Sequence, residues 1–67
     1  MTVDVIDMDG TVVETLSFEV PAGTTLTREF IIDKVRTKNY EPMAGVYGSD
    51  IGTVAQSGQT YHFEAEL

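Results

Sequence analysis

Residues 3–20 read VDVIDMDGTVVETLSFEV, two runs of strand-forming residues joined at Asp9-Gly10. Asp-Gly between two such runs is a strong hairpin signal, because a type I′ turn needs positive φ at both central positions. From Leu16 to Val20 apolar and polar side chains alternate, which is typical of a half-buried strand. Between Val13 and Leu16 the alternation slips by one residue, and a β-bulge would absorb that slip. The stretch therefore predicts an N-terminal β-hairpin with one apolar face.

The next segment predicts a helix, with a strand as the alternative. Residues 21–23 (Pro-Ala-Gly) end the second strand, and Thr24 and Thr25 each offer a hydroxyl for a helix N-cap. Across residues 26–38 charged side chains recur at helical spacing. The basic ones gather toward the C-terminal end, where the helix dipole favours them. Residues 30–32 (Phe-Ile-Ile) are also good strand formers, so a strand over this segment stays open.

The C-terminal half predicts two short strands and one clear one. Glycines, Asn39 and Pro42 interrupt the chain, leaving room for short strands at Ala44–Tyr47 and Ile51–Ala55. The last residues alternate without a break: Tyr61, Phe63, Ala65 and Leu67 take one face, and His62, Glu64 and Glu66 take the other. The fold expected for residues 1–67 is one α+β domain. It has a single small antiparallel or mixed sheet, an N-terminal hairpin and one helix. An all-β small sandwich or barrel is the alternative.

Charge and composition exclude several classes of protein. The chain has eleven carboxylate side chains and only four basic residues, which gives a formal net charge of −7. The basic residues all fall in one short stretch: Arg28, Lys34, Arg36 and Lys38. An acidic chain repels nucleic acid and anionic membrane, and it favours basic partners. With no Cys and one His, disulfides, thiolate zinc sites and His-rich metal sites are ruled out. No apolar run reaches the roughly 20 residues of a membrane span, and Asp4 stands where a signal peptide needs positive charge. A cytoplasmic protein is expected.

Residues 5–11 read VIDMDGT and resemble the first motif of haloacid dehalogenase-like phosphatases. In that family the first Asp is a Mg²⁺-bound nucleophile and the second is the acid/base, roles that would fall on Asp7 and Asp9. The resemblance covers seven residues, whereas the family needs a much longer doubly wound domain and further catalytic side chains. His62 could be a general base, but the pattern sets no Ser or Cys nucleophile beside it. The sequence therefore predicts no enzyme and no catalytic, cofactor-binding or metal-binding residue.

The order of the expected elements, with the segment Val20-Pro21-Ala22-Gly23-Thr24-Thr25-Leu26, resembles ubiquitin-like β-grasp domains. The resemblance implies that the first and last strands lie side by side, with the second strand flanking them. The sheet face away from the helix would then carry Asp4, Ile6, Ser17, Glu19, His62, Glu64 and Glu66. Such domains commonly bind partners through this face. We therefore expect the partner-binding residues to be Asp4, Ile6, Glu19, His62, Glu64 and Glu66. The chain ends Glu64-Ala65-Glu66-Leu67 without a Gly-Gly tail, so conjugation is not indicated.

These observations favour a small acidic, non-catalytic module that docks on a basic protein surface, with no direct contact to nucleic acid or membrane. The alternative is a phage-encoded inhibitor that mimics nucleic acid, because anti-CRISPR and anti-restriction proteins are similar in size, acidity and lack of Cys. A third interpretation, equally open, is that the acidic face only keeps a small protein soluble. Exposed sheet edges would also allow a homodimer.

Overall fold

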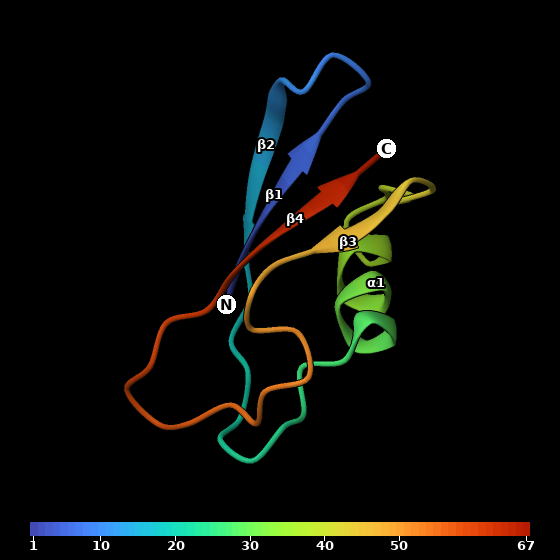
Figure 1. The fold of residues 1–67 in the computed structure, drawn as a ribbon. Coiled ribbons are helices and arrows are strands. Elements are labelled where there is room, and N and C mark those ends of the chain that lie inside the picture. The colour runs from blue at the N-terminus through green and yellow to red at the C-terminus, as the bar shows by residue number, and fades with distance from the viewer.

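The computed structural model describes all of residues 1–67 and consists of one helix packed on one face of a four-stranded sheet (Figure 1). The strands are β1 (Thr2–Ile6), β2 (Val12–Ser17), β3 (Gly45–Tyr47) and β4 (His62–Glu66), and the helix is α1 (Arg28–Arg36). The strand order is β2-β1-β4-β3, in which β1 and β4 pair in parallel at the centre and the outer pairs are antiparallel. The predicted α+β class and the central pairing of the first and last strands are confirmed. The helix excludes the all-β alternative.

The hairpin is confirmed, but its turn differs from the expected one. Gly10 N donates to Asp7 O at 3.0 Å, so Met8 and Asp9 are the central residues of the turn. Gly10 takes the left-handed φ of +81°, whereas Asp9 does not have a positive φ. The prediction of a type I′ turn centred on Asp9-Gly10 is therefore wrong. The loop is instead a turn followed by a left-handed glycine, a common longer hairpin connection.

The carboxylate of Asp7 is used by this turn. Its Oδ1 accepts hydrogen bonds from Asp9 N at 2.9 Å and from Thr11 N at 3.0 Å. Asp side chains often bind nearby backbone N–H groups in this way, and they stabilise turns by doing so. The structure thus gives the Asp7 carboxylate a role in holding the hairpin loop.

The predicted bulge is also confirmed. The β1–β2 register passes from Val5↔Glu14 to Ile6↔Val12, so Val13 has no partner on β1. One extra residue in a strand shifts the side-chain alternation by one position. Leu16 therefore points into the core and is buried, while Val12 and Val13 stay exposed.

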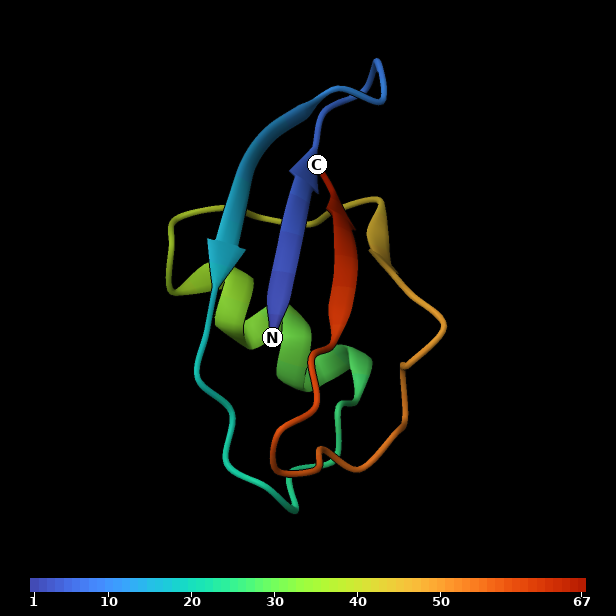
Figure 2. The same cartoon turned by 90° about the vertical axis from the view of Figure 1, so that its left-hand side faces the viewer.

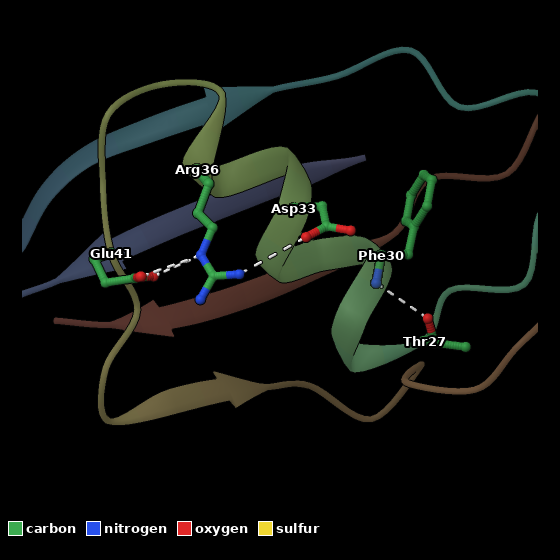
Figure 3. A network of polar contacts seen from close by, with 5 residues as sticks. All are labelled: Thr27, Phe30, Asp33, Arg36 and Glu41. Atoms are coloured by element: carbon green, nitrogen blue, oxygen red, sulfur yellow. Dashed lines mark hydrogen bonds and ion pairs between the residues drawn. The ribbon is translucent and has the colours of Figure 1, made fainter.

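The helix starts later than the sequence suggested. Its N-cap is Thr27, whose side-chain oxygen accepts a hydrogen bond from Phe30 N at 3.1 Å (Figure 3). The prediction that Thr24 or Thr25 is the N-cap is therefore wrong. Before the cap the backbone bonds outside the helix, since Leu26 N donates to Thr53 O at 2.8 Å and Thr27 N donates to Thr25 O at 2.9 Å. No helix in the structure has the length and apolar character that a membrane span requires.

Replacing Thr27 by alanine is expected to lower the free energy of unfolding by about 1 kcal/mol, because the N–H of Phe30 loses its acceptor. The matched control is Thr25→Ala, which removes an exposed hydroxyl that caps nothing. Urea denaturation followed by circular dichroism measures both. Equal losses in the two variants would contradict the assignment of the cap.

The core lies entirely between the helix and one face of the sheet. The fully buried Ile31 and Val35 of α1 pack in one cluster with Val3 and Val5 of β1 and with Phe63 of β4. The predicted inward face of β4 is confirmed, since Tyr61, Phe63 and Ala65 are buried. The opposite face of the sheet has no element in front of it, as Figure 2 shows with the helix behind the strands.

The predicted strand at Ala44–Tyr47 is confirmed as β3, but the one at Ile51–Ala55 is wrong. That segment makes only an isolated bridge, Thr25↔Val54. Its backbone pairs with the extended chain before the helix, for example through Gly52 N to Leu26 O and Ala55 N to Thr24 O, at 2.8 and 2.7 Å. These bonds tie the two long connections together and keep the segment out of the sheet.

Candidate functional site

The uncovered side of the sheet, here called the open face, collects polar side chains from all four strands. The register pairs Asp4 with Thr15 and with Glu64, and pairs Tyr47 with Glu64. Paired residues on neighbouring strands point to the same side, and alternate residues share a face. The open face therefore consists of Thr2, Asp4, Ile6, Val12, Thr15, Ser17, Tyr47, His62, Glu64 and Glu66.

A hydrogen-bonded network crosses the open face from β2 to β4. His62 Nε2 lies 3.1 Å from Asp4 Oδ2, and His62 Nδ1 lies 2.8 Å from Thr2 Oγ1. Thr15 Oγ1 donates to the other oxygen of Asp4 at 2.6 Å. A carboxylate only accepts, so Nε2 donates to Asp4, and Nδ1 shares a hydrogen bond with the hydroxyl of Thr2. The network fixes both nitrogens of the imidazole and leaves the Asp4 side chain only 22% exposed.

The order hydroxyl, imidazole, carboxylate in Thr2, His62 and Asp4 is the order found in nucleophilic triads. The sequence pattern did not point to Thr2 as the neighbour of His62, because the two residues meet only through the parallel β1–β4 pairing. Acyl transfer also needs donors aimed at a developing oxyanion. The N–H groups of β1 and β4 lie in the plane of the sheet and pair with neighbouring strands. These N–H groups are therefore not aimed at a group bound on the open face.

The structure places five of the six expected partner-binding residues, all except Glu19, on the open face. Asp4, His62, Glu64 and Glu66 are adjacent on β1 and β4. Ile6 shares their face but is only 8% exposed, so it offers little apolar surface to a partner. Glu19 follows the end of β2 and lines a separate hollow with Met1, Phe18, Val20 and Pro21.

The open face also contains Tyr47, which is not among the expected partner-binding residues. Tyr47 is 46% exposed, and its hydroxyl donates to Ala44 O at 2.6 Å. The ring lies over Gly45, because a Cβ added to Gly45 would be 3.0 Å from the Tyr47 hydroxyl oxygen. A strand of three residues is too short to show alternation, so only the pairing with β4 reveals the side to which Tyr47 points.

The basic residues lie on the other layer of the molecule. Arg28, Lys34 and Arg36 belong to α1 and Lys38 follows it. Arg36 Nε is 2.8 Å from Glu41 Oε2, and its Nη1 is 3.9 Å from Asp33 Oδ1 (Figure 3). The charge is therefore divided between an acidic open face and a mixed helix layer.

The contact between Arg36 and Glu41 predicts how the Glu41 carboxyl titrates. The hydrogen bond from the Arg36 guanidinium lowers the pKa of Glu41 below its ordinary value. The ionised Glu41 carboxylate therefore contributes to stability above its unfolded-state pKa of about 4.3. This contribution is lost as the pH falls through the lower pKa that Glu41 has in the folded state. A carboxyl NMR titration should show an early midpoint for Glu41, and Arg36→Gln should move that midpoint upward. An unchanged midpoint in Arg36→Gln would show that the pair does not form in solution.

No protein-family model, no curated protein and no solved structure matches the chain. The function of the open face must therefore be inferred from its own residues.

Proposed function

We propose that the protein is a non-catalytic binding module that docks its open face on a basic protein surface. The observation that carries this proposal is the position of Asp4, Glu64 and Glu66 on neighbouring central strands, on a face that no other element covers. No Lys or Arg lies on that face, since all four bases belong to α1 and the turn after it. A surface of one sign steers an oppositely charged partner and increases the rate of encounter.

The topology gives the proposal further support. The chain has a hairpin, a helix and a final strand parallel to the first, in the order β2-β1-β4-β3. This arrangement resembles that of ubiquitin-like β-grasp domains. Domains of that kind commonly bind partners through the sheet face away from the helix.

The alternative, a mimic of nucleic acid, has less support. A mimic needs its carboxylates aligned in one row, but several lie elsewhere: Asp7 and Asp9 in the hairpin loop, Glu29 and Asp33 on α1, and Glu41 beside Arg36. Competition by a short DNA duplex for the partner would distinguish the two functions, because only a mimic occupies a nucleic-acid groove.

Binding of a decalysine peptide at low salt tests the role of the open face. The variant Glu64→Lys/Glu66→Lys is expected to weaken binding by about tenfold or more and to flatten its salt dependence, since opposite charges no longer meet. The matched control is Asp9→Lys/Asp33→Lys, which changes exposed acids away from the open face. Each double reversal adds four charges to −7, so both variants carry −3. Equal weakening in both would mean that only net charge matters, and it would overturn the proposal.

A further inference from the structure

A hollow of about 390 Å³ opens at one end of the open face, beside β4. It exists because β3 ends at Tyr47, whereas β4 extends two residues further, to His62. The chain after β3 turns away from the sheet and forms the far wall. The lining residues are Tyr47, Gly48, Ser49, Asp50, His62, Phe63 and Glu64.

The chemistry of the hollow favours a cation. Asp50 comes from the loop and Glu64 from β4, so two carboxylates from different segments line the same space. Neither side chain makes an ion pair or a hydrogen bond within the chain, whereas Asp4 and Asp7 are both engaged. No Lys or Arg contributes to the lining, so the negative charge there is not balanced by the protein itself.

Tyr47 lines the same hollow, and its ring lies back along β3 over Gly45. Its hydroxyl is held by Ala44 O at 2.6 Å, and Gly45 leaves room for the ring to lie against the strand. Glu64 is the residue directly opposite Tyr47 on β4. An exposed aromatic ring beside a carboxylate suits a planar cation, which can stack on the ring and donate to the carboxylate.

Building on the proposed docking of the open face, we propose that this hollow receives one arginine side chain of the basic partner. The guanidinium donates to Asp50 and Glu64, and its plane or its aliphatic stem lies against Tyr47. Arginine fits better than lysine, because its planar fork offers five donors and stacks on aromatic rings, whereas an ammonium is a compact, strongly hydrated charge. The hollow would thus supply the specificity that a uniformly charged face lacks.

The proposal is tested by NMR titration of the labelled protein with hexa-arginine and, separately, with hexalysine. Hexa-arginine is expected to shift the amide signals of residues 47–50 and 62–64, and to bind at least about threefold more tightly than hexalysine. Asp50→Asn should weaken hexa-arginine binding by about fivefold to tenfold, since one charge-assisted contact is lost. Tyr47→Leu should reduce the preference for arginine. Asp9→Asn, which removes a charge far from the hollow, should change neither.

The outcomes separate this proposal from the docking function. In one outcome the two peptides bind equally, Asp50→Asn has no effect, and Glu64→Lys/Glu66→Lys weakens binding. This outcome overturns the proposed arginine site in the hollow and leaves docking of the open face intact. A titration that perturbs no signal of β1 or β4 with either peptide overturns both. The Asp50 side chain makes no hydrogen bond or ion pair within the chain, so Asp50→Asn is expected to stay folded, and its amide spectrum without peptide verifies this.

Discussion

Replacement of Leu26 by alanine is expected to lower the free energy of unfolding by about 2–5 kcal/mol, the range for a large-to-small change in a core. Leu26 is fully buried and packs in the same cluster as the helix and the central strands. Its backbone also joins two segments, donating to Thr53 O and accepting from Gly52 N, both at 2.8 Å. A domain of this length has a total stability of about 3–10 kcal/mol, so the variant loses a large share of it.

Urea denaturation followed by circular dichroism measures the effect of Leu26→Ala. The matched control is Val54→Ala, which deletes apolar atoms from a side chain that is 49% exposed in the neighbouring loop. That control is expected to change stability by no more than about 0.5 kcal/mol. If both substitutions have the same small effect, Leu26 does not anchor the helix to the loop in the way described.

Replacement of Gly48 by alanine is expected to destabilise the fold by about 1–3 kcal/mol through overpacking. The added Cβ would lie 2.6 Å from Phe63 Cδ1 and 3.1 Å from His62 O. Phe63 is fully buried and cannot move aside, and the carbonyl of His62 belongs to β4. Gly48 does not have a positive φ, so the cost comes from this contact and not from the backbone conformation.

A double-mutant cycle isolates that contact. In a Phe63→Leu background the ring edge is gone, so Gly48→Ala should cost less than it does in the natural chain. Ser49→Ala, an exposed change at the next position, serves as the control and is expected to be nearly neutral. Strict additivity of the Gly48 and Phe63 substitutions would show that the two residues do not press on one another.

Local pattern was sufficient to predict most of the secondary structure. The hairpin, the bulge and the inward face of β4 follow from alternation with a period of two, which a short stretch of sequence displays by itself. The spacing of charged residues predicted the helix, but residue type did not identify its N-cap. Thr24 and Thr25 are as good caps as Thr27 by residue type, and the choice was made by the burial of Leu26 and its pairing with residues 52–53.

The strand expected at Ile51–Ala55 shows the same limit. Ile51 and Val54 have high strand propensity, but strand propensity depends on finding a neighbour in a sheet. Here β4 already has β1 on one side and the short β3 on the other, and the segment pairs with residues 24–26 instead. Tertiary context overrode the local preference.

For the open face, the sequence by itself determined that His62, Glu64 and Glu66 share one side of a strand, because side chains alternate along any β-strand. Only the tertiary structure decided which residues lie next to them. The parallel pairing of β1 with β4 places Thr2 and Asp4 beside His62, and the pairing of β3 with β4 places Tyr47 beside Glu64. The loop after β3 brings Asp50 to the hollow that Glu64 also lines. These contacts join segments up to 60 residues apart. Their register depends on how the whole core packs, which no local stretch of the chain records.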